Sequence, residues 1–486
     1  MTGPGALTAE LHLFWPEGVL ALAAFGVLTA DLVLPRGRRN LWGAALALLG
    51  LAAVLAVTVP LSAGRDASLY GGLVRVDAFT FLFRVLFVGM AAFTVLTSVD
   101  YVRRHLAHPG EYYGLLLLGT LGMVLMAAAT ELLTAYIALE LASFSLYVLA
   151  AYARGDARSN EAGTKYILLG AFSSAVLLYG ISLVYTGVGA TRYADVAAAL
   201  AQGGVPASAG VGLALVLVGL GFKVAAVPFH MWAPDVYEGA PTPVTAFIAV
   251  ASKAAGFAFL LRLFGEGLLP AIGQWQGVVA VLAAVTMTVG NLVALAQRNI
   301  KRLLAYSSIG QVGYLLMGIA ALSDLTSNGV NEHLVGYAFT NLAVFAAVIA
   351  VQNATGGEEF KDLNGLADRH PFLAAAITMA LFSLAGLPFF AGFTTKFYLF
   401  TATAAEGLLW LATLAVLLSL VSLYYSLVVI RHLYIEPAPQ GAGRLRVSPL
   451  LTGTVAALTV GVILVGVYPQ PFVAAVEAAS RALLGS

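Results

Sequence analysis

The sequence predicts an all-α polytopic membrane protein with about 14 transmembrane helices, two of them broken, and three observations carry this prediction. Of the 486 residues, 60% are hydrophobic and only 10% are charged, whereas about a quarter of a soluble domain is charged. The apolar residues form runs long enough to cross about 30 Å of hydrocarbon as helices, and they lack the alternation of a transmembrane barrel. There is no cysteine, which excludes disulfides, iron–sulfur clusters and thiolate metal sites.

The expected spans follow one another with short connections, and no stretch is long and polar enough to form a separate soluble domain. We expect the spans near 12–34, 41–61, 78–99, 113–129, 132–151, 165–186, 210–228, 243–264, 276–296, 303–322, 333–353, 371–402, 408–430 and 449–468. The stretch 187–210 is rich in Ala and Gly and is compatible with a short surface helix. The opening run MTGPGALTAELHLFWPEG lacks the basic region and cleavage site of a signal peptide, so the first span is expected to direct its own insertion.

The distribution of basic residues predicts the orientation of the helices. One set of loops holds 16 Lys and Arg, and the opposite set, with the tail, holds 5. Because cytoplasmic loops are enriched in Lys and Arg, we expect the first set in the cytoplasm and both termini outside. The first set comprises Arg36, Arg38, Arg39, Arg103, Arg104, Arg154, Arg158, Lys165, Arg298, Lys301, Arg302, Lys361, Arg369, Arg431, Arg444 and Arg446. The second comprises Arg65, Arg75, Arg192, Arg262 and Arg481, and the 4 within spans are Arg84, Lys223, Lys253 and Lys396.

Two of the spans contain a proline break, and their spacing indicates an internal repeat. The seventh contains Lys223 before Pro228, and the twelfth, interrupted in the run SLAGLPFFAGF, contains Lys396 after Pro388. The broken spans lie five apart in order, and an odd offset gives opposite orientations in the membrane. This predicts an inverted repeat of spans four to eight and nine to thirteen, residues 113–264 and 276–430 of a single membrane domain 1–486, as in many transporters.

Three lysines fall near the middle of their spans, where a lysine costs about 2.5–3.5 kcal/mol on insertion scales. Lys223, Lys253 and Lys396 could each pair with a carboxylate and lock helices together, and Lys396 could instead extend to the interface. The sequence places only one carboxylate, Glu140, at similar depth. One acid cannot neutralise three ammonium groups, and buried lysines that lose their charge can carry protons. We therefore expect Glu140, Lys223, Lys253 and Lys396 to be proton-transfer residues.

Glu140 lies in a polar stripe on the fifth span. Tyr136, Ser143 and Tyr147 fall at helical spacing on the same face. An intramembrane carboxylate is a functional candidate by default. Its structural interpretation is an ion pair, or a protonated acid bonded to Ser143.

Other polar residues have both a relay and a structural interpretation. His230, just after Pro228, could carry protons from the cytoplasmic side or stabilise a loop. Asp235 and Glu238 are expected to hold the connection before the eighth span, and Arg84, nearer an outer edge beside Asp77, is expected to be structural. The polar faces of the tenth and eleventh spans could order water or join helices. These faces comprise Ser307, Gln311, Tyr314, Tyr337, Thr340 and Asn341.

Two runs, KVAAVPFHMWAPDVYEGAPTPVTAFIAVASKAAGF and KRLLAYSSIGQVGY, together with the Glu140 span, closely resemble the antiporter-like membrane subunits of respiratory complex I, the NADH:quinone oxidoreductase. The run PDVYEGAPTPV, lysine at position 396 and the lack of a long C-terminal extension are most similar to the subunit N group, the bacterial counterpart of mitochondrial subunit 2. The resemblance covers about residues 75–435. Subunits L and M and sodium/proton antiporter subunits share only the general scheme.

The resemblance implies a proton-translocating subunit of NADH:quinone oxidoreductase in the bacterial cytoplasmic (inner) membrane, among other antiporter-like and small membrane subunits. It implies that Glu140 pairs with Lys223, that Lys253 is the central relay and that Lys396 faces the outer side. It also implies that NADH, FMN, iron–sulfur clusters and quinone belong to partner subunits, with no cofactor, metal or nucleic acid bound by this chain. One alternative is a stand-alone or Mrp-type cation/proton antiporter subunit, although sodium would favour a cluster of oxygen ligands at depth. The other is a structural anchor, which would not need the deep charges.

Overall fold

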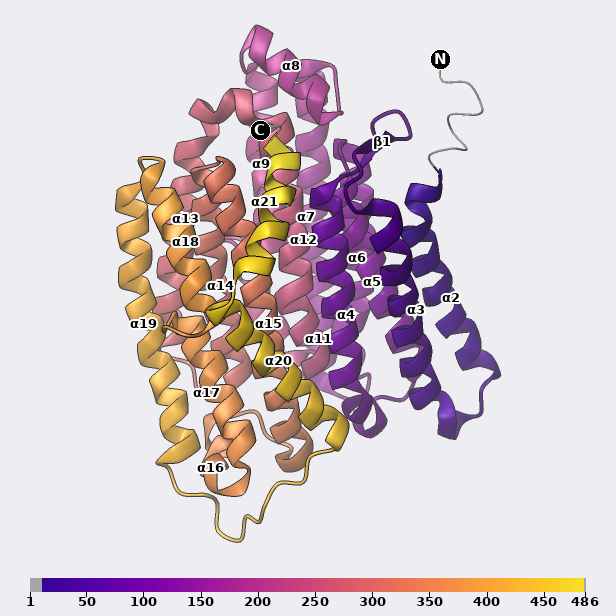
Figure 1. Cartoon of the computed structure of the whole chain (residues 1–486), viewed down its shortest axis with the longest axis vertical. Coiled ribbons are helices and arrows are strands. Elements are labelled where there is room, and N and C mark those ends of the chain that lie inside the picture. Colours follow the sequence, from indigo (N-terminus) through magenta and orange to yellow (C-terminus); the bar gives the residue numbers. More distant parts are fainter. Residues whose placement is uncertain (1–10, 485–486) are drawn as a thin grey trace.

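The protein is a bundle of long helices, shown in Figure 1. The structure is a computed structural model that describes residues 11–484. The first ten residues, which belong to the run where no signal peptide is expected, lie outside the described part. Figure 1 shows the beginning of α2 (Trp15–Val33) and the end of α21 (Gln470–Leu484) at the same end of the bundle.

The first third of the chain contains eight further elements. These are the 3-10 turns η1 (Leu11–Phe14) and η2 (Arg36–Arg38), the helices α3 (Arg39–Ser62), α4 (Ala78–His105), α5 (Pro109–Ala128) and α6 (Leu132–Ala150), and the hairpin of strands β1 (Ala67–Leu69) and β2 (Val74–Val76). The two strands are antiparallel, with Ser68 opposite Arg75.

The remaining elements are almost all helical. The middle of the chain contains α7 (Ala157–Val188), α8 (Tyr193–Gly203), α9 (Ala207–Val224), α10 (Trp232–Gly239), α11 (Thr242–Phe247), the π-helical turn η3 (Ile248–Ser252), α12 (Lys253–Arg262), the π-helical turn η4 (Leu263–Gly267), the 3-10 turn η5 (Leu269–Ala271) and α13 (Ile272–Ala294). The last part contains α14 (Ile300–Ala320), α15 (Asp324–Thr355), the 3-10 turn η6 (Phe360–Leu363), α16 (Leu366–Arg369), α17 (Pro371–Ala385), α18 (Ala391–Ala405), α19 (Leu409–Tyr434) and α20 (Pro449–Val467).

The all-α membrane fold predicted from the sequence is confirmed. Within residues 11–484, 13 helices are long and apolar enough to cross a membrane. The expected twelfth span is instead divided into α17 and α18, of 15 residues each, which Figure 1 shows end to end. Helix α8 is the short helix expected in 187–210. The inverted repeat stays a prediction.

Capping residues set many of the helix boundaries. Asp77 and Glu131 accept hydrogen bonds from backbone N–H groups at the starts of α4 and α6, and Ser323 forms a capping box at the start of α15. Gly356 and Gly386 end α15 and α17 in the left-handed conformation, which glycine adopts without steric cost. Local sequence therefore fixes where these apolar helices begin and end.

The centre of the bundle is formed by the spans that carry polar residues. In α11–α12 with its π-helical turns, the most apolar 18-residue window is 100% buried, and in α14 and α15 the corresponding share is 94%. In the peripheral helix α3 it is only 28%. Polar side chains on the central helices are therefore shielded from lipid, whereas the outer helices present apolar surface to it.

Both proline-containing breaks leave backbone carbonyls that lack an intrahelical donor. Helix α9 ends at Ala225, whose φ is +63°, and Trp232 Nε1 donates to the carbonyl of Phe222 at 2.8 Å. Helix α17 ends at Gly386, and the carbonyl of Leu384 accepts from Lys396 Nζ at 2.6 Å. A buried tryptophan and a buried lysine thus satisfy carbonyls that the two breaks release.

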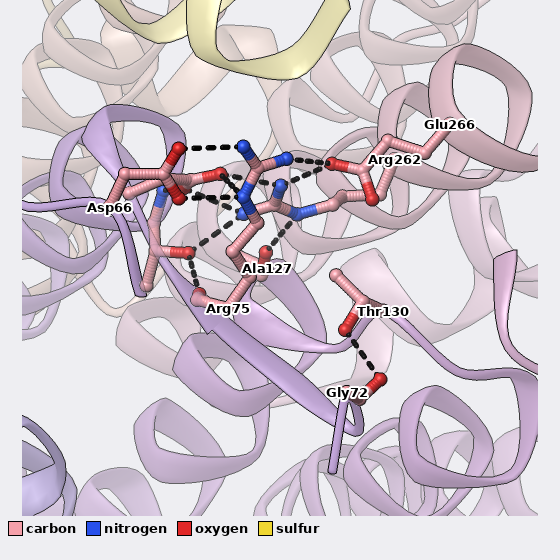
Figure 2. Close-up of polar contacts among 9 residues, drawn as sticks. Asp66, Gly72, Arg75, Ala127, Thr130, Arg262 and Glu266 are labelled. Carbon is pink, nitrogen blue, oxygen red and sulfur yellow. Dashed lines mark hydrogen bonds and ion pairs between the residues drawn. The ribbon is translucent and has the colours of Figure 1, made fainter. Parts of the chain in front are cut away.

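The hairpin and the end of α12 are joined by an ionic cluster, shown in Figure 2. Arg75 contacts Asp66 at 2.8 Å and Glu266 at 3.4 Å. Arg262 contacts Glu266 at 2.6 Å and Asp77 at 2.7 Å. Figure 2 shows the two guanidinium groups close together, so the carboxylates between them fix the hairpin to α12.

One expectation about arginines is wrong. Arg84, expected to be structural, donates to Glu17 at 2.5 Å and to Ser62 at 2.6 Å, and all three are buried. Asp77 pairs with Arg262, which is fully buried rather than placed in an outer loop. Sequence depth alone could not show this, because Asp77 and Arg262 are 185 positions apart.

Candidate functional site

Lys223 lies in α9 just before the first break and contacts α6. Its Nζ donates to Ser143 Oγ at 2.9 Å, and Ser143 donates to the carbonyl of Leu139 at 2.7 Å. Glu140, one turn before Ser143, is half-buried, and its Oε1 has no hydrogen-bond partner among residues 11–484. Within the described chain, Glu140 and Lys223 form no direct ion pair, so the pairing implied by the resemblance is corrected. Lys223 donates its hydrogen bond to Ser143 and interacts with the Glu140 charge through space.

Lys253 begins α12 directly after the π-helical turn η3. It is 1% exposed, and its Nζ donates to Ser308 Oγ on α14. Ser308 also shares a hydrogen bond of 2.6 Å with the hydroxyl of Tyr337 on α15. The ring of Tyr237 lies 5.5 Å from the Lys253 ammonium, where its face can stabilise a cation. The second lysine therefore has hydroxyl and aromatic neighbours.

Lys396 lies on the second half of the broken span and reaches back to the first half. Besides donating to the carbonyl of Leu384, its ammonium lies 4.8 Å from the ring centre of Tyr314. Gln311 Nε2 donates to the same carbonyl at 3.2 Å. The side chain is 3% exposed, so Lys396 does not extend to the interface.

His333, which sequence reasoning did not select, joins the surroundings of Lys253 and Lys396. Its Nε2 lies 3.2 Å from Gln311 Oε1, and its Nδ1 lies 2.9 Å from Thr395 Oγ1. Its ring stacks on Tyr337 with 6.3 Å between centroids. Between Lys253 and Lys396 lie Ser308, Tyr337, His333 and Gln311, in that order. Hydrogen bonds join Lys253, Ser308 and Tyr337, the rings of Tyr337 and His333 stack, and Gln311 contacts His333 and shares the Leu384 carbonyl with Lys396.

Lys223 on α9 and Lys253 on α12 lie where the two helices pack closely, but no series of polar side chains joins them among the described residues. A Cβ added at Gly256, one turn after Lys253, would lie 3.6 Å from Lys223 Cγ. Glycine at this position therefore allows α9 and α12 to approach closely. Neither lysine donates a hydrogen bond to a group that the other contacts, within the part of the chain that the structure describes.

The polar faces expected on the tenth and eleventh spans are partly placed as predicted. Gln311 and Tyr337 lie among the polar side chains between Lys253 and Lys396, but Ser308 rather than Ser307 contacts Lys253. The other four candidates have contacts outside this connection, and of these only Tyr314 lies beside a lysine, Lys396. Ser307 accepts from Tyr425, Tyr314 accepts from Asn291, Thr340 contacts Ser383 and Asn341 donates to the carbonyl of Tyr337.

The connection before α11 is held by charges, as predicted. Asp235 contacts Lys165 at 2.7 Å and Arg302 at 2.8 Å, and Glu238 contacts Arg302 at 2.9 Å. His230 is half-buried, and its Nδ1 has no hydrogen-bond partner within residues 11–484. These contacts fix α10 to α7 and α14 beside the first break.

The sequence indicates one carboxylate and three lysines deep within the spans, and this count is wrong. Glu332 is buried inside α15, because that helix begins at Asp324 rather than near 333. Lys301 is buried at the start of α14, where it donates to Glu358 at 2.9 Å and to the carbonyl of Ala240 at 2.9 Å. A helix boundary placed several residues late hid both Glu332 and His333 from the sequence argument.

A polar cavity of about 860 Å³ lies next to Lys301. Its lining includes Gln352 and Glu358, which are joined by a hydrogen bond of 2.5 Å, together with Asn299 and Arg302. Lys301 contacts Glu358 at the inner side of this cavity. Water there can reach the start of α14, the helix that carries Ser308, the hydrogen-bond acceptor of Lys253.

Comparison with known proteins identifies the family and the fold of the chain. The family described as "NADH:quinone oxidoreductase/Mrp antiporter, TM" matches residues 129–422. The chain is 45% identical to the NADH-quinone oxidoreductase subunit N of Moorella thermoacetica, over 95% of this chain and 97% of the relative. A chain of respiratory complex I from Thermus thermophilus has a TM-score of 0.81 at 33% identity, covering 95% of this chain and 99% of that one. A chain of the Mrp complex from Dietzia sp. DQ12-45-1b has a TM-score of 0.87 at 22% identity, with 98% of each chain covered, and this likeness shows the fold alone.

Proposed function

We propose a proton-transfer role for Glu140, Lys223, Lys253 and Lys396, on the premise that this chain belongs to the NADH:quinone oxidoreductase/Mrp antiporter family and, within it, to the subunit N group of NADH-quinone oxidoreductase. The chain is a proton-translocating membrane subunit of that enzyme complex, and its partners are the complex's other membrane subunits. The redox chemistry is assigned to partner subunits, which would hold NADH, FMN, iron–sulfur clusters and quinone. We place the chain in the bacterial cytoplasmic membrane with both termini on the outer side.

The observation that supports the role best is the polar connection from Lys253 to Lys396. Lys223, Lys253 and Lys396 make no ion pair within the described residues, and each instead donates to a neutral oxygen. A permanently charged lysine at mid-depth costs about 2.5–3.5 kcal/mol on insertion scales. Amines that exchange their protons through hydroxyl, imidazole and amide neighbours avoid a permanent buried charge.

The transfer steps follow from the neighbours of each lysine. The Glu140 carboxylate stabilises the charged Lys223, because opposite charges in a low-dielectric interior attract. When the redox reaction removes or shields that negative charge, the proton on Lys223 Nζ is released toward Lys253. It then passes from Lys253 Nζ along Ser308, Tyr337, His333 and Gln311 to Lys396. The cavity beside Lys301 supplies protons from the cytoplasmic side.

The alternative is a stand-alone or Mrp-type cation/proton antiporter subunit. The similarity in fold to the Mrp complex favours it. The sequence relatives favour the complex I assignment, because the identity is 45% to subunit N of Moorella thermoacetica and only 22% to the Mrp chain.

Lysine-to-arginine variants test the proposed role in the intact complex. Lys253→Arg and Lys396→Arg keep a positive charge, but a guanidinium cannot release its proton in a protein. Since acid–base groups contribute about 10²–10⁴-fold to proton-transfer steps, we expect at least about a tenfold loss of NADH:quinone turnover and of proton pumping in membrane vesicles. Lys361→Arg is the control, because Lys361 is exposed and pairs with Glu359. Parental pumping by either relay variant would contradict the role.

A further inference from the structure

The outer part of α15 carries a polar face that the relay does not use. Asp324, Asn328, Asn331 and Glu332 are spaced by four, three and one residues, which places them on one side of the helix. Asp324 and Asn328 are half-buried, whereas Asn331 is 1% exposed and Glu332 is 2% exposed. The face therefore leads from the solvent-accessible end of the helix into the interior.

Every residue of this face has a buried oxygen that lacks a protein hydrogen-bond partner in residues 11–484. The atoms are Asp324 Oδ1, Asn328 Oδ1, Asn331 Oδ1 and Glu332 Oε1. Leaving one buried acceptor unsatisfied costs about 1–3 kcal/mol. Four such oxygens within three helical turns require another hydrogen-bond donor. The donor that buried polar groups ordinarily use is water.

Helix α21 covers this face without satisfying it. Ser480 accepts from Ser327 at 3.1 Å and from Asn331 Nδ2 at 3.2 Å. These bonds hold α21 against α15, but none of them is donated to the four oxygens. Figure 1 shows α21 in yellow running from the middle of the bundle to the end where the described chain stops. The face therefore follows α21 toward the end of the bundle where Asp324 is partly exposed.

The inner end of the face lies beside the relay. Glu332 is followed by His333, which contacts Gln311 and Thr395. Thr395 immediately precedes Lys396, and Gln311 shares the carbonyl of Leu384 with the Lys396 ammonium. The inner end of the polar face is therefore one residue before His333, a group of the proposed proton path.

We infer that protons leave this subunit for the outer side along a wetted line between α15 and α21, with Glu332 as its proton-carrying side chain. The inference rests on the proposed function of Lys396. The proton leaves Lys396 Nζ, crosses to Glu332 through water and neutralises the Glu332 carboxylate. It then passes to water beside Asn331, Asn328 and Asp324, which restores the carboxylate. No other group is consumed in the cycle.

Substitution of Glu332 tests its role in the intact complex. Glu332→Gln keeps the shape of the side chain but cannot take up a proton, so we expect at least about a fivefold loss of coupled turnover and proton pumping. Glu332→Asp keeps the carboxylate and is expected to retain most activity. Glu477→Gln is the matched control, because Glu477 lies on α21 but pairs with Arg481 at the exposed surface. Parental activity in Glu332→Gln would overturn the inference.

Thiol labelling tests the wetted line itself, since the chain contains no cysteine. Asn328→Cys should react with a charged, membrane-impermeant methanethiosulfonate added from the outer side, measured as a mass increase of this subunit. Val330→Cys should not react, because Val330 is fully buried on the opposite face against Gly318. Equal labelling of both positions, or of neither, would overturn the inference.

Lys396→Ala separates this inference from the proposed function. Slow turnover in Lys396→Ala with parental turnover in Glu332→Gln would reject the outward line and leave the relay standing. Parental turnover in Lys396→Ala would reject the relay, and with it the inference. Slow turnover in both variants, together with labelling of Asn328→Cys alone, is the result we expect.

Discussion

Single residues determine how the three buried lysines differ. Lys223 has a carboxylate within electrostatic reach, whereas Lys253 and Lys396 have hydroxyl, carbonyl and aromatic neighbours. Ser143 separates Lys223 from Glu140, so the acid influences the lysine without neutralising it by contact. Glu140 can therefore change the charge state of Lys223 without a rearrangement of packed side chains.

Removal of the Glu140 carboxylate is expected to impair coupling and leave the fold intact. Glu140 Oε1 makes no hydrogen bond within residues 11–484, so Glu140→Ala removes a charge rather than a structural contact. We expect coupled NADH:quinone turnover and pumping to fall at least about threefold, because one nearby charge is worth on the order of 1 kcal/mol or more. Glu140→Asp should be milder.

The measurement is turnover and proton uptake in vesicles with equal amounts of assembled complex. Glu406→Ala is the control, because Glu406 is exposed at the end of α18. Identical rates in Glu140→Ala and the parent would remove Glu140 from the path.

Among the glycine positions on the described helices, Gly392 at the junction of α17 and α18 leaves the least room for an added Cβ atom. A Cβ added at Gly392 would lie 1.8 Å from the carbonyl oxygen of Ser383, which real contacts do not allow. Ser383 also contacts Thr340 at 2.9 Å and accepts from the Gly392 N–H at 2.9 Å. The junction therefore fixes both the Leu384 carbonyl and the lysine that binds it.

Gly392→Ala is expected to destabilise this junction. The added methyl group must push the two half-helices apart, and overpacking of this kind costs about 1–3 kcal/mol. We expect a lower thermal unfolding midpoint of the subunit in the detergent-solubilised complex. Gly453→Ala on α20 is the control, because no atom lies within 4 Å of its added Cβ. A Gly392→Ala midpoint equal to that of the control would show that the junction is not rigid.

The elements that the sequence predicts best are long and apolar. The GLP and AGF runs predict the break in the twelfth span, because glycine and proline interrupt a helix in a recognisable way. Strands β1 and β2 have only three residues each, too few for a periodic pattern. Helix α21 has only 15 residues and is interrupted by Glu477 and Arg481, so a search for long apolar spans misses it. The selection of Ser307 instead of Ser308 shows that helical spacing gives a face only to within one residue.

At the scale of the whole molecule, the ionic cluster of Figure 2 joins distant parts of the chain. Arg75 and Glu266 are 191 positions apart, and Asp77 and Arg262 are 185 apart. The hydrogen bond from Arg75 lowers the pKa of Asp66 below its usual value. Burial acts to raise the pKa of Asp77, but the charge and hydrogen bonds of Arg262 outweigh it and lower that pKa as well.

This cluster predicts loss of stability in acid. A carboxylate with a lowered folded-state pKa stabilises the fold above its unfolded pKa of about 3.9, and this contribution is lost as the pH falls through the folded value. Asp66→Asn should therefore lower the unfolding midpoint of the subunit at pH 6, and the difference from the parent should shrink below about pH 4. Asp368→Asn, at an exposed position, should show no such trend. A difference that is constant with pH would contradict the prediction.

The placement of the three lysines near the middle of their spans has an electrical consequence. Lys223 lies midway along the broken span of α9 and α10, Lys253 lies near the centre of 242–267, and Lys396 reaches the junction of α17 and α18. Moving one elementary charge across the whole membrane involves about 2.3 kcal/mol per 100 mV. A proton that travels among groups at equal depth moves parallel to the membrane plane and performs almost none of this work. On the proposed path, the membrane voltage therefore acts on proton uptake and on release past Glu332, and the lateral transfers between lysines run at nearly constant potential.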